Sequence, residues 1–457
     1  MLVSFAMNES LTLAHHIANT RADDIPGDVL TVAKKSLLDA IGVSLAATTL
    51  GEGCKPFVDL ALAEGGKPES TILGFGARVP ATRAAFANGA LAHALDFEDA
   101  YDGAPVHPNA ATIPAALAIA ESLGNVSGKQ LLAAIILGSD LVCRLGLALK
   151  TNPLDDGWYI PPILGAFGAT AAASKLLHLN AEQIVDAFSL TLCQATCSAE
   201  LTRSPRAVVR SVRDAFAAQA GVIAALLARD GVAGFDQPIE GQAGLFNLYA
   251  RGKYDPFALI QDLGKTFESA NVSFKPYPSC RGTHTYIDAV LHILKAHRID
   301  PGAVEEIGVV IQPVNKMLCE PRDQKQNPAT AIDAKFSIPF VVATTLVHGQ
   351  VALDQFFPRA LSDARVLALA RRVTYRVDAA SPAILQIKMC DENFSAQIDF
   401  ARGHPRNPIS ADALIQKFFD CAKYAARKIS DHHRREIVDL VLNLERVENI
   451  GELMARL

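Results

Sequence analysis

The sequence predicts a mainly α protein, with a large all-helical domain built on a central helix bundle and a smaller, inserted α+β domain. Three observations predict it. In residues 1–268, Ala- and Leu-rich segments repeat apolar residues at three-to-four spacing between Gly and Pro punctuation. In residues 269–402, short runs alternate apolar and polar residues, which is typical of strands. Residues 403–457 are helical again, so they are expected to return to the first domain.

The helical domain is predicted from long apolar segments. The most hydrophobic stretch is interrupted by Asp140 and Arg144, which favours a buried helix over a membrane span. Gly165 and Gly168 predict a helix that packs very close to a neighbour. The segments are Ala81–Phe97, Ala110–Leu123, Gly128–Leu149, Ile163–Leu177 and Arg213–Ala228.

The inserted domain is predicted from its strand patterns. Leu385–Met389 and Phe394–Phe400 alternate on either side of Asp391–Asn393, which indicates a hairpin. Further strands are expected at Glu306–Gln312 and Val373–Val377, and helices at 284–296 and 337–347.

Composition excludes several function classes. The chain has 457 residues, half of them apolar, which is enough for two domains. A net charge of −5 does not favour binding to nucleic acid or to an anionic membrane, but allows a local basic pocket for a small anion. No signal peptide is visible, so a cytoplasmic location is expected. Nucleotide, flavin and serine-hydrolase motifs are absent, and the scattered cysteines are expected to be reduced.

A first candidate stretch, residues 88–114, carries imidazole and carboxylate side chains: His93, Asp96, Asp99, Asp102 and His107. The first three are spaced three apart, so they would share a face if the chain were helical there. Such groups at a helix end suit proton transfer. A solvated acidic helix end remains an alternative, as does a metal site, although the spacing matches no known metal motif.

A second candidate stretch carries four arginines at three- and four-residue steps, predicting a guanidinium stripe on one helical face: Arg203, Arg206, Arg210 and Arg213. Arg binds carboxylates through two parallel hydrogen bonds, so the stripe suits a di- or tricarboxylate. A solvated surface face is the alternative.

Two more stretches carry candidate basic residues. Lys275 and Arg281 cluster with Cys280 and His284 where the chain enters the inserted domain, and domain interfaces favour pockets. A packed thiol is favoured there over a Cys–His nucleophile. Lys335 lies among apolar residues and is a further candidate, with a structural salt bridge as the alternative.

These stretches, in their order along nearly the whole chain, resemble the MmgE/PrpD family. The resemblance is carried by NGALAHALDFEDA, HPNAATIPAALAIAE, ILGAFGATAAASKLL, KPYPSCRGTHTYIDA, DAKFSIPFVVATTLVHG and RGHPRNPIS. The family includes 2-methylcitrate dehydratase, cis-aconitate decarboxylase and iminodisuccinate epimerase. The resemblance implies a helical domain with an inserted α+β domain, an active site between them, and a homodimer.

The resemblance also implies site residues. Asp96 and His107 match acid/base positions of the family, and Lys275 matches a substrate-binding lysine. Arg210 stands where many members have lysine. Decarboxylases and dehydratases of the family typically carry histidine where this chain has Ile160, and the adjacent Tyr159 could supply a hydroxyl instead.

The predicted function is a cofactor-free lyase that acts on a small di- or tricarboxylate by proton transfer next to a carboxylate. An epimerase or isomerase that uses two bases is the first alternative, and an inactive binding protein of the same fold is the second. No metal or cofactor is expected. The predicted catalytic residues are Asp96, His107 and Tyr159, and the predicted substrate-binding residues are Arg210, Lys275, Arg281 and Lys335.

Overall fold

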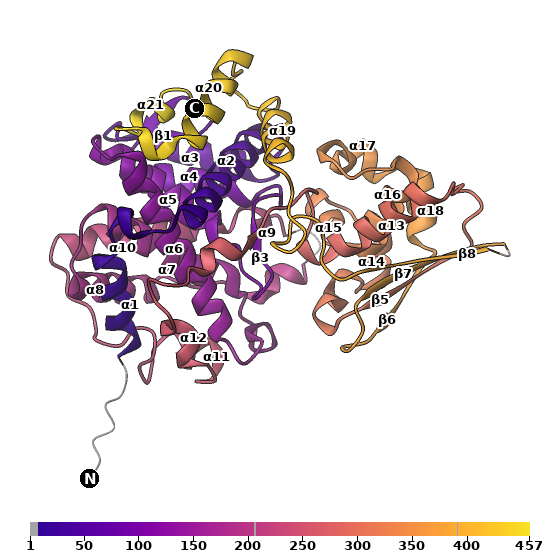
Figure 1. The fold of residues 1–457 in the computed structure, drawn as a ribbon, viewed down its shortest axis with the longest axis horizontal. Helices are drawn as coiled ribbons and strands as arrows, with labels where there is room; N and C mark the ends of the chain where they lie inside the picture. The colour runs from indigo at the N-terminus through magenta and orange to yellow at the C-terminus, as the bar shows by residue number, and fades with distance from the viewer. Residues whose placement is uncertain (1–7, 205–206, 391) are drawn as a thin grey trace, which may run out of the picture.

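The structure is a computed structural model that describes residues 8–204, 207–390 and 392–457. Most described residues are helical, which confirms the predicted mainly α class. Figure 1 shows the helices of the first half gathered in one body, with the strands β5 to β8 in a smaller part at the other end of the long axis. Arg206 and Asp391, named in the sequence analysis, lie outside the described residues.

The centre of the larger body is the helix α7 (Ile160–Leu176), which packs against its neighbours α5, α6 and α10. Its side chains are almost all buried because the sequence offers mainly Ala, Gly and Leu there. A Cβ atom on Gly168 would lie 2.4 Å from a methyl group of Val142, so glycine is required for this close approach. The predicted close packing is therefore confirmed at Gly168, whereas Gly165 has only ordinary contacts around it.

The other helices of the body surround this centre. Two apolar helical stretches, 128–148 and 209–229, are long enough to cross a membrane, but 94% and 72% of their most apolar windows are buried in the protein. Both stretches are therefore core segments of the protein, as predicted for the first. The helices are α1 (Glu9–Asn19), α2 (Gly27–Leu50), α3 (Cys54–Glu64), α4 (Ala81–His93), α5 (Pro108–Leu123), α6 (Gly128–Ala148), α8 (Ala181–Leu192), α9 (Val209–Val212), α10 (Asp214–Arg229), α11 (Leu245–Ala250) and α12 (Pro256–Ile260).

The smaller part holds a four-stranded sheet in the order β6-β5-β7-β8, with β5 and β6 parallel and the other pairs antiparallel. The predicted hairpin is confirmed as β7 and β8, and the predicted helix over 284–296 is α13. Strands and helices here are β5 (Glu306–Ile311), β6 (Val373–Val377), β7 (Ala383–Met389), β8 (Glu392–Ile398), α13 (His284–Ala296), α14 (Arg322–Gln326), α15 (Ala331–Lys335), α16 (Ile338–His348), α17 (Pro358–Leu361) and α18 (Ala364–Ala370). These elements share a hydrophobic core of their own, between residues 277 and 396. The domain limits drawn from the sequence stay a prediction.

The C-terminal helices pack on the larger body: α19 (Ala411–Ala422), α20 (Asp431–Leu442) and α21 (Gly451–Met454). The side chain of Lys417 on α19 is buried and lies 2.6 Å from Asp39 on α2. Its ammonium also donates to the carbonyls of Phe97 and Lys275, at 2.6 and 2.9 Å. One buried charge therefore joins the C-terminal segment to three other parts of the chain.

Replacing Lys417 with alanine is expected to lower the free energy of unfolding by about 3–5 kcal/mol, because Asp39 would stay buried without its partner. Urea unfolding followed by circular dichroism measures the change. Lys423→Ala is the control, since Lys423 also pairs with an aspartate but is exposed, and should cost less than about 1 kcal/mol. Equal losses in the two variants would contradict a stabilising role for the buried pair.

Candidate active site

The turn after α4 forms the first part of the site. The sequence predicts helix through Phe97, but α4 ends at His93, so that prediction is wrong for the last turn. Asp96 adopts a left-handed backbone conformation with φ 49°, which ends helical geometry, and its N–H donates to the carbonyl of His93. Aspartate tolerates this conformation better than most residues do. His93, Asp96 and Asp99 therefore do not form the predicted helical face.

A two-residue ladder brings a second segment to this turn. The short strand β3 (Ala100–Tyr101) pairs antiparallel with β4 (Val272–Ser273). Lys275, two residues beyond β4, reaches back to Asp96, and its Nζ lies 2.6 Å from Oδ1 and 3.0 Å from the carbonyl oxygen. Both side chains are completely buried. Two predicted site residues, Asp96 and Lys275, are therefore in direct contact.

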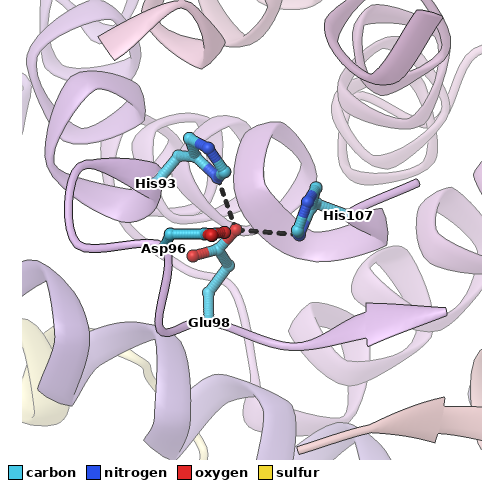
Figure 2. A group of neighbouring side chains, drawn as sticks. All are labelled: His93, Asp96, Glu98 and His107. Carbon is cyan, nitrogen blue, oxygen red and sulfur yellow. Dashed lines mark hydrogen bonds and ion pairs between the residues drawn. The ribbon is translucent and has the colours of Figure 1, made fainter. Parts of the chain in front are cut away.

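Four side chains meet at the centre of the site: His93, Asp96, Glu98 and His107 (Figure 2). Glu98 lies between the two imidazoles, and its Oε1 is 2.5 Å from Nδ1 of His93 and 2.9 Å from Nδ1 of His107. His107 occupies the N-cap of α5 and is the most accessible of the four, with 15% of its side chain exposed. The imidazole rings meet edge to face at 4.9 Å between centroids.

Charge distribution around the cluster favours ionised carboxylates. Burial opposes ionisation of Asp96 and Glu98, but Lys275 and the imidazoles overcome it and hold both pKa values below their usual range. The pKa of His93 is lowered by burial and by the nearby Arg213. Near neutral pH the cluster therefore contains two carboxylates and an uncharged His93 beside the Lys275 ammonium.

Three further predicted residues, Lys335, Tyr159 and Arg210, lie outside the cluster itself. The Nζ of Lys335 donates to the carbonyl of Leu95 at 2.6 Å, and burial lowers the pKa of Lys335 to about 8. Tyr159 is the N-cap of α7, and the guanidinium of Arg210 lies 5.9 Å from its ring centroid. Arg210 also stacks 3.5 Å from the ring centroid of Phe336, which follows Lys335 in the chain.

The three arginines of the predicted stripe that the structure describes, Arg203, Arg210 and Arg213, do not lie on one continuous helix. Helix α9 spans only four residues, Arg203 follows a separate short 3-10 helix, and Arg213 stands between α9 and α10. The sequence could not reveal these breaks because the apolar periodicity continues through them. Arg210 and Arg213 nevertheless come together, since Nη1 of Arg213 donates to the carbonyl of Arg210.

Arg281 has its donors occupied by protein atoms. Its Nε and Nη2 bind the two carboxylate oxygens of Asp102 at 3.0 and 2.9 Å, and its Nη1 binds the carbonyl of Arg402. This arrangement favours a positioning role over the predicted contact with substrate. For Cys280, burial raises the pKa to about 11, and the neighbouring His284 binds the carbonyl of Ser279 instead, which favours the packed thiol.

The cluster could also be considered as a metal site, because one ligand atom from each of its four residues lies within 4.8 Å of the others. The donor set fits a metal poorly. The Glu98 oxygen already binds both imidazoles, and Asp96 is neutralised by the Lys275 ammonium, which would repel a cation. An acid/base role uses these same contacts without displacing any of them.

Two cavities of about 350 and 200 Å³ lie elsewhere on the larger body. The first is lined by C-terminal residues including Arg427, and the second by residues near Lys175. Neither is lined by a predicted site residue, and neither brings together acid/base groups comparable to the cluster. The chemistry of the side chains therefore makes the cluster the candidate active site.

Together, the buried helical bundle and the enclosed imidazole–carboxylate cluster define a helical protein with a candidate acid/base site. Comparison with known protein families gives matches to one family over most of the chain. Residues 11–257 match the MmgE/PrpD N-terminal domain and residues 277–444 match the MmgE/PrpD C-terminal domain, so the chain belongs to the MmgE/PrpD family.

Several curated relatives are similar over nearly their whole length. A cis-aconitate decarboxylase-like protein of Aspergillus oryzae is 29% identical over 98% of this chain and 97% of its own. Human cis-aconitate decarboxylase is 26% identical over 98% of this chain and 94% of its own. The 2-methylcitrate dehydratase of Cupriavidus necator is 24% identical over 94% of this chain and 92% of its own.

Asp99 should make the protein less stable as the pH rises. Burial raises its pKa to about 7, although Asn109 donates a hydrogen bond to it. Because an unfolded aspartate has a pKa near 4, the folded state binds the extra proton between about pH 4 and 7, and stability falls through this window by up to about 1.4 kcal/mol per pH unit.

Asp99→Asn is expected to remove this part of the pH dependence and to be more stable than the wild type at about pH 8. Urea unfolding at about pH 5 and about pH 8 tests it. Asp59→Asn serves as the control, because Asp59 is exposed. The same loss of stability between the two pH values in wild type and Asp99→Asn would contradict the assignment.

Proposed function

We propose that this protein is a cofactor-free lyase that removes water or carbon dioxide from a small di- or tricarboxylate. The observation that carries the proposal is the buried cluster in which Glu98 holds two imidazoles beside the Asp96–Lys275 pair. The names of the relatives, cis-aconitate decarboxylase and 2-methylcitrate dehydratase, support the same substrate class.

His107 is the proposed base. Its Nδ1 lies 2.9 Å from Glu98 and 3.1 Å from the carbonyl of Asp99, which assigns the proton to Nδ1 and leaves Nε2 with a lone pair. Glu98 would stabilise the imidazolium that forms when Nε2 takes a proton. When the proton is removed, negative charge builds up on the neighbouring substrate carboxylate. The buried cations Lys275, Lys335 and Arg210 would stabilise this charge.

Epimerisation is the alternative, and Lys335 favours it as the source of a second base. Its lowered pKa, about 8, leaves a fraction of the amine uncharged near neutral pH, so that it could accept or return a proton. Ile160, 5% exposed at the first position of α7, cannot donate a proton to a leaving group. Product analysis separates the two reactions, by ultraviolet absorbance for a new alkene or by chiral chromatography for inversion.

Deuterium exchange in D2O tests whether the protein is an enzyme. The wild type is expected to incorporate deuterium next to a carboxylate of at least one acid in a panel of 2-methylcitrate, cis-aconitate and iminodisuccinate. His107→Ala should lower the rate by roughly 10²–10⁴, the usual contribution of a general acid/base. His432→Ala, which changes an exposed histidine, is the control. An unchanged rate in His107→Ala would exclude His107 as the base, and no exchange by the wild type would favour an inactive binding protein.

Ile160 leads to a prediction about substrate preference. Loss of a general acid costs about 10²–10⁴ in rate, so the protein is expected to dehydrate 2-methylcitrate with kcat/KM below about 10⁴ M⁻¹s⁻¹. Tyr159→Phe should lower activity on the true substrate, because the hydroxyl is the nearest replacement for the missing acid. Steady-state kinetics with both proteins measure this, and efficient dehydration of 2-methylcitrate by the wild type would show that Ile160 does not limit the reaction.

Three further properties belong to the proposal. Residues 269–402 are proposed as an inserted α+β domain, which the separate hydrophobic core of residues 277–396 supports. A homodimer and a cytoplasmic location, both expected from the sequence, stay predictions. Sedimentation velocity at micromolar concentration tests the dimer.

A further inference from the structure

Two arginines beside Tyr159 are buried with donors unused. Arg210 is 6% exposed and Arg213 is 2% exposed. In both, Nε and Nη2 have no hydrogen-bond acceptor among residues 8–204, 207–390 and 392–457. A buried guanidinium without an acceptor is unfavourable, because its charge has left water and nothing has replaced the lost hydrogen bonds. The pair therefore requires acceptors that the described chain does not supply.

The unused atoms form the edge with which arginine binds a carboxylate. Nε and Nη2 lie side by side on the guanidinium plane and can donate two parallel hydrogen bonds. The same edge of Arg281 binds Asp102 at 3.0 and 2.9 Å, and that of Arg365 binds Asp363 at 3.2 and 2.8 Å. Within this protein, the Nε/Nη2 edge is thus repeatedly the one that meets a carboxylate.

Arg213 is linked to the acid/base cluster through Asp214. The guanidinium of Arg213 is 4.9 Å from the ring centroid of Tyr159. Its neighbour in the chain, Asp214, has Oδ2 4.0 Å from Nδ1 of His93 and 3.7 Å from Nε of Arg213. The 3.7 Å separation is too long for a hydrogen bond, so Asp214 balances the charge of Arg213 without filling its edge.

Arg213 is held in place by the chain segment that carries Arg210. It stands between the two helices, and its Nη1 donates to the carbonyl of Arg210, which holds the two arginines together. A ligand with one carboxylate would satisfy one edge and leave the other buried and unused. A ligand with two carboxylates satisfies both.

We propose that Arg213 is a substrate-binding residue that acts with Arg210 to select acids with at least two carboxylates. The sequence names Arg213 only as a member of the arginine stripe and not among the predicted substrate-binding residues. The inference deepens the proposed function by assigning the substrate class to particular donors, and it rests on that function only in taking the ligand to be the substrate.

Isothermal titration calorimetry with ligands that need not react tests the proposal. The probes are propane-1,2,3-tricarboxylate and succinate, with butyrate as the monocarboxylate of the same chain length as succinate. Arg213→Gln should weaken binding of the first two by about 10–100-fold, the loss expected for hydrogen bonds to a charged group, and change butyrate binding by less than about threefold. Arg213→Lys keeps the charge but not the edge, and should also lose the preference for polycarboxylates.

Arg229→Gln is the matched control. It lies on α10, and its Nε/Nη2 edge is already filled by Asp230 at 2.8 and 3.2 Å, so binding of every probe should stay unchanged. Thermal unfolding without ligand reports on folding. A substrate-binding role predicts that Arg213→Lys unfolds within a few degrees of the wild type but loses the stabilisation that propane-1,2,3-tricarboxylate gives to the wild type.

The outcomes separate this proposal from the lyase function. Polycarboxylate binding within about threefold of the wild type in both Arg213 variants would overturn it, as would a wild type that binds neither polycarboxylate. If Arg213→Gln does not fold, Arg213→Lys decides. Arg213-dependent binding of a polycarboxylate without any deuterium exchange would contradict the lyase function and leave the assignment of Arg213 in place.

Discussion

The ion pair between Lys275 and Asp96 holds the site together. Both side chains are completely removed from solvent, and they come from segments 179 residues apart. Two buried charges are tolerated only when they are paired and hydrogen-bonded, so neither residue can move away from the other without a large penalty. The pair holds the turn after α4, in which Asp96 has a left-handed backbone conformation. This turn places Glu98 between the two imidazoles.

Negative and positive groups are distributed unevenly around this pair, and the distribution favours binding of an anion. On one side, one oxygen of each carboxylate binds the imidazoles or the ammonium, while Oδ2 of Asp96 and Oε2 of Glu98 have no hydrogen-bond partner among the described residues. On the other side, the guanidinium groups of Arg210 and Arg213 carry positive charge with unused donors. An anionic ligand placed between the two sides would complete the electrostatics of the site. Because the surroundings are dry, that completion would be stronger than the same contacts in water.

The helices and the hairpin could be predicted because periodic burial is local information. The helix over 284–296 and the alternation in β7 and β8 needed nothing beyond spacing. The turn after α4 could not be predicted in the same way, since the end of that helix depends on a lysine far along the chain. Glu98 was missed for this reason: an uninterrupted helix through Asp99 would have placed it on a different face from His93 and Asp96.

The roles of the basic residues also could not be predicted from their positions in the sequence. Lys275 and Arg281 lie six positions apart in one conspicuous stretch, and composition gives no means of ranking them. The structure distinguishes them by their partners, since Arg281 is occupied by Asp102 while Lys275 reaches the cluster. Arg213 was noticed only as part of a stripe, because a sequence shows where a charge is but not whether another group already satisfies it.

Because of the contacts of Lys417, the site of this enzyme can be completed only late in its synthesis. Its ammonium binds the carbonyl of Phe97, beside the cluster, and that of Lys275, at the ion pair. The ribosome makes Phe97 long before Lys417. During most of translation, the segment around Phe97 therefore lacks its contact with the Lys417 ammonium. Contacts so distant along the chain form late and slowly. A nascent chain released before α19 would therefore carry every proposed acid/base residue and still lack the support that holds them in place.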